Sequence, residues 1–195
     1  MKSLTTIAVV GGLLLIALVS GCNNYNAFVG LEEDVENAWS KVQSAYQRRA
    51  DLIPNLVETV KGAANFEQQT LEGLVSARAR ATSITIDPSN ITPEQLKQFQ
   101  EAQAGVSSAL QRLLVVSENY PQLRAGDNFK ELQAQLEGTE NRIKVERDKF
   151  NDVATTYNKR IRRFPASFFA NIFGFEQKAQ FEAESTAQEA PKVKF

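Results

Sequence analysis

Few residues of this chain are equipped for chemistry, because it contains no histidine and a single cysteine, Cys22. Ser-His-Asp and Cys-His catalysis, His-ligated zinc and the Glu-x-x-His di-iron bundle all need an imidazole, so the composition excludes them. One cysteine cannot form an internal disulfide or a cysteine-rich metal site. With 22 Lys+Arg against 23 Asp+Glu, the chain also lacks the basic excess typical of nucleic-acid binding. We therefore expect no catalytic residues, no metal, no cofactor and no nucleic-acid partner.

Cys22 is preceded by a short positively charged start and an apolar run from Leu4 to Val19. This order is typical of a secretory signal, and the run is slightly short for a transmembrane helix, which needs about 20 residues. Residues 18–22 (LVSGC) resemble the lipobox of bacterial lipoproteins, in which the cysteine is acylated and becomes the mature N-terminus. We expect residues 1–21 to be a lipoprotein-type signal peptide, with an uncleaved signal-anchor helix as the alternative. Both place the rest of the chain outside the cytoplasm, at a bacterial cell membrane or outer membrane.

Acidic residues cluster early in the chain, at Glu32, Glu33, Asp34 and Glu36. Their order does not follow an EF-hand loop, and adjacent residues of a helix point in different directions. We interpret them as acids placed in the first turn of a helix, where they complement the helix dipole.

Two charged stretches and one aromatic stretch are the candidate interaction sites. Arg49 falls on an apolar sevenfold row, where a charge is costly unless it is paired. Its head could reach solvent or a carboxylate, join a polar network inside the bundle, or meet a partner. The basic run near residue 160 either complements a helix C-terminus or contacts anionic headgroups. The phenylalanines of residues 164–175 either cap the bundle end or form an exposed patch for a membrane or partner. The candidate interaction residues are Arg48, Arg49, Asp51, Arg160, Arg162, Arg163, Phe168, Phe169 and Phe173.

Apolar residues recur at steps of three and four through most of the chain, which predicts an all-α, antiparallel up-and-down bundle of long helices. The first helix is predicted over 25–81, with a kink at Pro54 and continuation past Gly62. Residues 83–90 form a loop, and Thr92-Pro93 begins the second helix, which ends near residues 119–121. The third helix reaches Phe164-Pro165, and a short C-terminal helix follows. Residues 22–175 thus form one helical domain, and residues 176–195 are expected to be a disordered polar tail.

The residues resemble the LemA family across nearly all of 25–175. The most specific motif is residues 47–62 (QRRADLIPNLVETVKG), supported by Glu118-Asn119-Tyr120-Pro121, residues 135–141 (QLEGTEN), Phe150-Asn151 and Tyr157-Asn158. The sequence departs from the family at residues 63–67, where members often carry an aromatic residue and a histidine. The resemblance implies a membrane-anchored antiparallel helical bundle outside the cytoplasm, with no established enzymatic activity.

Three functions from different classes fit these features. The favoured one is a non-enzymatic, membrane-anchored envelope scaffold or interaction module whose partners are the membrane, other envelope proteins or a second copy of itself. The alternative is a module that binds lipid headgroups or cell-wall polymer through the basic and phenylalanine-rich stretches. An enzyme using paired carboxylates would need a cleft between them, which a slim bundle offers poorly.

Overall fold

The computed structural model describes residues 2–62 and 66–182, with the backbone alone for 2–9, 13, 14, 16 and 17. All regular structure in this part of the chain is helical. The helices are α1 (Lys2–Lys61), α2 (Gln68–Ser83), α3 (Pro93–Ser117), α4 (Pro121–Ala125), α5 (Asp127–Arg162) and α6 (Ala166–Phe173).

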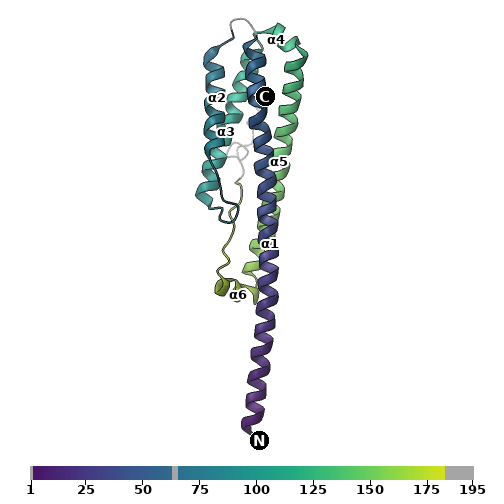
Figure 1. Cartoon of the computed structure of the whole chain (residues 1–195), viewed down its shortest axis with the longest axis vertical. Helices are drawn as coiled ribbons and strands as arrows, with labels where there is room; N and C mark the ends of the chain where they lie inside the picture. The colour runs from purple at the N-terminus through teal and green to yellow at the C-terminus, as the bar shows by residue number, and fades with distance from the viewer. Residues whose placement is uncertain (1, 63–65, 183–195) are drawn as a thin grey trace, which may run out of the picture.

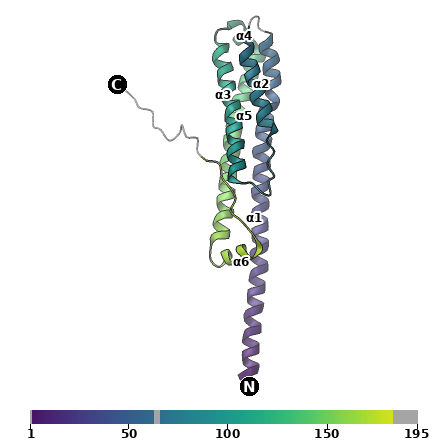
Figure 2. The same cartoon turned by 90° about the vertical axis from the view of Figure 1, so that its left-hand side faces the viewer.

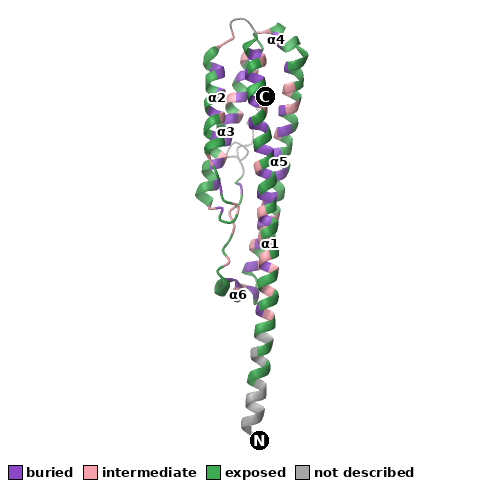
Figure 3. Cartoon of the chain, viewed as in Figure 1, coloured by how far each residue is buried: buried purple, intermediate pink, exposed green. Residues whose placement is uncertain are grey.

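The four long helices run alternately up and down, as predicted (Figure 1). α1 and α5 pack antiparallel along most of the length of α5, whereas α2 and α3 are shorter and cover only the upper half of that pair (Figures 1 and 2). Buried side chains form stripes on the facing sides of the helices (Figure 3). The upper cluster centres on Leu56, Leu74 and Leu113, and the lower one on Trp39 and Phe150. The predicted fold class and the short C-terminal helix are confirmed.

Pro54 lies inside α1, which continues to Lys61, so the prediction that the helix passes through the proline is confirmed. A proline has no N–H, and the carbonyl four residues earlier, on Ala50, therefore loses its helical hydrogen bond. Nε of Arg78, on α2, donates to that Ala50 oxygen at 2.7 Å. A side chain from the neighbouring helix thus replaces the missing backbone donor.

The predicted continuous helix over 25–81 is wrong, because α1 ends at Lys61 and α2 begins at Gln68 in the opposite direction. A straight continuation would leave Leu71, Leu74 and Ala77 without partners beyond the end of α5. Folding α2 back buries all three against α1 and α3. The apolar repeat continues across the turn, so only Gly62 marked it in the sequence, and one glycine costs a helix no more than about 1 kcal/mol.

The predicted start of the second long helix is confirmed. Thr92 caps α3, its Oγ1 accepting from the Gln95 N–H at 3.2 Å, while Oε1 of Gln95 accepts from the Thr92 N–H at 3.2 Å. This reciprocal pair is a capping box, and Pro93 occupies the first turn, where its missing N–H costs nothing. The short helix α4 between α3 and α5 was not anticipated.

The expected disordered tail is wrong for residues 176–182, which lie against α1 and α5 without forming a helix. We call residues 175–182 the strap. Phe181 is buried against Trp39 and Phe150, and hydrogen bonds from α5 hold the backbone beside it. The sequence is polar because half of the strap residues are exposed to solvent: Glu176, Gln177, Gln180 and Glu182. Residues 183–195 of the expected tail lie outside the described residues.

The interpretation of the acidic cluster as a first helical turn is also wrong, because α1 begins at Lys2 and residues 32–36 lie well inside it. Glu32 instead pairs with Lys178 of the strap. Within the residues that the structure describes, no helix is both long enough and apolar enough to cross a membrane.

The Arg78–Ala50 bond predicts a specific coupling with Pro54. Arg78→Leu should cost about 1–3 kcal/mol of unfolding free energy, because it leaves a carbonyl without a donor. In a Pro54→Ala background, where residue 54 supplies the N–H, the same substitution should cost clearly less. A double-mutant cycle by denaturant unfolding measures this coupling, and equal costs in the two backgrounds would contradict the assignment.

Candidate functional sites: a buried arginine network and an exposed phenylalanine helix

Arg49 is the centre of a polar network inside the bundle, and its side chain is 2% exposed. Nη1 contacts Oε1 of Glu140 on α5 at 2.7 Å and Oγ of Ser107 on α3 at 2.8 Å. Nη2 donates to Oε1 of Gln103 at 2.5 Å and to its backbone carbonyl at 3.1 Å. The planar guanidinium can bond to α3 and α5 at once, and so links both to α1, because its donors form a rigid fork. Of the interpretations of Arg49 left open by the sequence, two are observed together: its head reaches a carboxylate, and it joins a polar network inside the bundle.

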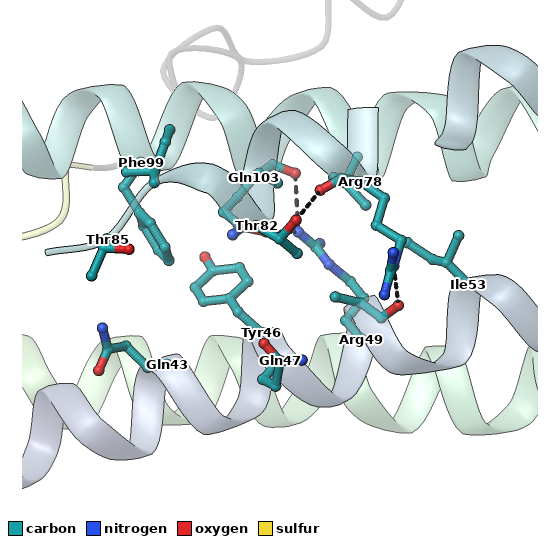
Figure 4. A pocket seen from close by; sticks show the side chains of 14 residues that line it. Gln43, Tyr46, Gln47, Arg49, Ile53, Arg78, Thr82, Thr85, Phe99 and Gln103 are labelled. Carbon is teal, nitrogen blue, oxygen red and sulfur yellow. Dashed lines mark hydrogen bonds between the residues drawn. The ribbon is translucent and has the colours of Figure 1, made fainter. Parts of the chain in front are cut away.

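The surroundings of Arg49 are partly aromatic and partly hollow. Its guanidinium carbon lies 5.1 Å from the centre of the Tyr46 ring. Burial raises the pKa of the Tyr46 phenol, against the opposing effect of the Arg147 and Arg49 cations. A cavity of about 190 Å³ opens beside them between α1, α2 and α3, with Arg78, Thr82 and Gln43 on its walls (Figure 4). The two arginines of this cavity, Arg49 and Arg78, both donate hydrogen bonds to groups of the bundle itself. The arrangement therefore holds helices together.

The neighbours of Arg49 in sequence point the other way. Arg48 and Asp51 are exposed on the outer face of α1, where Oδ1 of Asp51 accepts from Nε2 of Gln47 at 2.8 Å. They remain candidate contacts for a partner, but they do not join the Arg49 network.

The phenylalanine-rich stretch forms α6, which packs across α1 near the lower end of α5, while α1 continues below it (Figure 2). Two residues of α6 itself, Ala166 and Ala170, are buried on the side that faces the bundle. A β-carbon placed on Gly21 would lie 3.4 Å from Cε1 of Phe169, and the Tyr25 and Phe173 rings lie 5.2 Å apart. α6 is therefore level with exposed Cys22, the predicted lipidation site, which adjoins Gly21.

The large apolar side chains in and beside α6 divide between two sides. Phe169 packs inward, whereas Phe168 and Ile172 are 61% and 60% exposed, and Phe164 just before the helix is 90% exposed. Phe173 does both, since it meets Tyr25 and is still 42% exposed. Both readings of this stretch hold in part, because one side caps the bundle and the other forms an apolar surface open to solvent.

The predicted basic run is split as well. Arg160 is half-buried, donating from Nη2 to Oδ1 of Asn24 at 3.0 Å, with its guanidinium carbon 6.0 Å from the centre of the Phe28 ring. Arg162 and Arg163 are exposed at the C-terminal end of α5, beside α6. Only these two of the three predicted arginines are available to an anionic surface.

Glu146 is a buried carboxylate that sequence reasoning missed, and its side chain is 2% exposed. Oε1 contacts Nε of Arg142 at 2.8 Å and Nζ of Lys149 at 3.3 Å, while Oε2 has no hydrogen-bond partner among the described residues. Its position between Ile143 and Phe150 on the three-and-four repeat of α5 was the available signal. Within the described side chains, no group of acidic or cysteine residues is arranged to hold a metal ion.

The asymmetric burial of the Arg49–Glu140 pair predicts an asymmetric effect of mutation. Glu140→Ala leaves the buried cation unpaired and should cost about 3 kcal/mol of unfolding free energy. Arg49→Met should cost less, because Glu140 is 42% exposed and can be hydrated once its partner is gone. Denaturant unfolding followed by circular dichroism compares the two variants. A larger loss for Arg49→Met would mean that packing of the arginine stem outweighs its charge.

Comparison with known proteins identifies relatives over most of the chain. The LemA family model matches residues 38–195. The magnetosome protein MamQ of Magnetospirillum gryphiswaldense is 30% identical over 186 residues, which cover 87% of this chain and 68% of the relative. MamQ 2 of Paramagnetospirillum magneticum is 29% identical with the same coverage. Protein LemA of Metamycoplasma hominis is 25% identical over 152 residues, covering 78% of this chain and 66% of the relative. This chain, with its helical bundle and buried arginine network, therefore belongs to the LemA family.

Proposed function

We propose that this protein is a non-enzymatic, membrane-anchored scaffold of the bacterial cell envelope, attached through lipid on Cys22. The observation that carries the proposal is the continuity of α1. This 60-residue helix contains Cys22 and also supplies one side of the bundle core. Its part from Cys22 to Lys61, which would remain after cleavage, is about 60 Å long at 1.5 Å per residue. With no flexible linker between attachment point and core, the anchor also orients the bundle.

The lower end of the bundle has the chemistry of a membrane-facing surface. Phe164, Phe168 and Ile172 expose apolar side chains there, and Arg162 and Arg163 add positive charge beside them. Apolar and cationic groups together are what interfacial helices use against anionic lipid. Because α6 is level with Cys22, acylation at that residue would bring these side chains to the lipid surface.

A non-catalytic role is supported by the use of the polar groups in the core. Arg49 and Glu140 satisfy one another, and Arg78 completes the α1 backbone. These contacts stiffen the joints between helices, as a scaffold requires. The wider groove over Arg49 between α3 and α5, with Glu140 and Arg147 on its walls, is open and faces solvent.

The first prediction of this proposal concerns Cys22. The mature wild-type protein should lack residues 1–21, carry acyl chains and incorporate labelled palmitate. Two or three chains would hold it firmly, since each buried methylene contributes roughly 0.8 kcal/mol. Cys22→Ser should retain residues 1–21 and take up no label, whereas the control Asn26→Ser, at an exposed position of the same helix, should behave as wild type. Intact-mass spectrometry reads the result, and a wild-type mass that includes Met1–Gly21 would overturn lipidation.

A second prediction tests the orientation of α6. In vesicles containing brominated lipid, the membrane-attached Phe168→Trp variant should show strong fluorescence quenching. The matched control is Val115→Trp, at a position 65% exposed near the upper end of α3, which should be quenched little. Trp39 is buried in both variants and supplies the same background. Equal quenching of the two variants would show that the lower end of the bundle does not meet lipid.

A further inference from the structure

The strap is an extended peptide bound in a groove of its own chain. Gly174, at φ 77°, ends α6 in the left-handed region that glycine adopts most readily, and the Phe175 N–H donates to the Ala170 carbonyl at 3.0 Å. The chain then turns upward along the lower half of the α1–α5 pair, below α2 and α3 (Figure 1). The strap therefore replaces a third helix there. Its upper end meets α3, where Nε2 of Gln100 donates to the Glu182 carbonyl at 3.1 Å.

Two asparagines of α5 clamp the strap backbone in the same way. Asn151 donates from Nδ2 to the Phe181 carbonyl at 3.0 Å and accepts at Oδ1 from the Phe181 N–H at 2.8 Å. Asn158 does the same at Lys178, with both distances 2.9 Å. Each side-chain amide thus pairs with the N–H and C=O of one residue, as a neighbouring β-strand would. On the strap, these four hydrogen bonds involve main-chain atoms only.

The spacing of the clamps matches an extended peptide. Asn151 and Asn158 are two helical turns apart, about 10.5 Å along α5. Three residues of extended chain, from Lys178 to Phe181, span about 10 Å. The side chains of Lys178 and Phe181 both face the bundle, while Gln180 and Glu182 are exposed.

The first of these side chains enters a pocket suited to a cation. Lys178 is 10% exposed, and its Nζ lies 2.5 Å from Oε1 of Glu32 and donates to the Ser89 carbonyl at 2.9 Å. The same Nζ lies 5.7 Å from the centre of the Tyr157 ring. A carboxylate, a carbonyl and an aromatic face thus surround one ammonium group.

The second pocket is aromatic. The Phe181 ring stacks on Trp39 with 6.0 Å between centres and meets the Phe150 ring edge-on at 5.6 Å. The guanidinium carbon of Arg147 lies 4.7 Å from the centre of the Phe181 ring. The two asparagine clamps bond only to the backbone of the strap and so do not distinguish side chains. Specificity therefore comes from the two pockets, which fit a lysine and, three residues later, a phenylalanine in an extended chain.

We propose that this groove also accepts the strap of a second copy, so that neighbouring proteins on one membrane exchange residues 178–182. The four residues 174–177 would link the exchanged segment to its own bundle, and they reach about 14 Å when extended. Exchange therefore requires the grooves of two copies to lie within that distance of each other. Exchange keeps the Lys178 and Phe181 contacts unchanged. The local concentration of the protein on the membrane therefore decides whether the strap binds its own groove or that of a neighbour. The proposal rests on anchoring, which holds neighbours at equal height and concentrates them.

A disulfide trap tests the exchange in native membranes. Nε2 of Gln180 lies 2.5 Å from Oγ1 of Thr155, so these two positions are neighbours across the groove, and a single chain carrying both cysteines establishes that the pair reacts. Full-length Thr155→Cys and Gln180→Cys copies, carrying different tags, are co-expressed and oxidised with copper phenanthroline. A bond between differently tagged chains forms only when the strap of one copy occupies the groove of the other. Mass spectrometry of the linked peptides separates it from any bond made by Cys22.

The matched control replaces Gln180→Cys by Gln177→Cys, an exposed residue of the same strap on the other side of the Lys178 clamp. We expect the 155–180 mixed disulfide to exceed the control several-fold and to fall to the control level when Asn151→Ala and Asn158→Ala remove the clamps. A single chain carrying both cysteines verifies that the pair reacts. An intrachain bond there, with a mixed disulfide no higher than the control, would overturn the exchange. Membrane attachment is measured on the same samples, so loss of anchoring is read separately.

Discussion

The unequal lengths of the two helix pairs constrain the whole structure. α1 and α5 have 60 and 36 residues, whereas α2 and α3 have 16 and 25, so the longer pair extends well below the shorter one. An apolar stripe left open over that distance would be unstable in water. The chain covers it with α6 and the strap, which help to bury Phe28, Trp39 and Phe150, while Phe99 at the start of α3 also packs on Trp39.

Charged and polar side chains serve as joints between these helices. Arg49 links α1, α3 and α5, Arg78 completes the backbone of α1 beside Pro54, and Lys178 ties the strap to α1 and to the α2–α3 loop. A buried ion pair contributes little to net stability, because desolvation offsets the attraction between the charges. Such contacts do penalise other registers of the helices, since each misplacement would leave a buried charge without its partner. The core is apolar in bulk and is aligned by a few polar contacts.

The two ends of the α1–α5 pair differ in character. The upper end is closed by α4 and the turns, where Phe66 and Tyr120 pack ring to ring at 4.9 Å between centres. The lower end carries Cys22, α6 and the exposed arginines. This polarity fits a protein that stands on a membrane at one end and presents its sides to neighbours, with the strap groove on one of those sides.

The sequence by itself determined the helical fold, the passage of α1 through Pro54, the cap at Thr92 and the helix formed by residues 166–173, because each depends on local spacing and on residue types within a few positions. The burial of Arg49 was also visible, since a charge on an apolar row demands partners. Only the tertiary structure decided which partners Arg49 has and where the chain reverses after Lys61. It also decided that Arg160 is half-buried and that the strap docks on the bundle. These features depend on contacts between residues far apart in the chain, such as Lys178 with Glu32 and Arg49 with Glu140. A helical repeat shows which face of a helix is buried, but helix lengths and packing determine what lies against it.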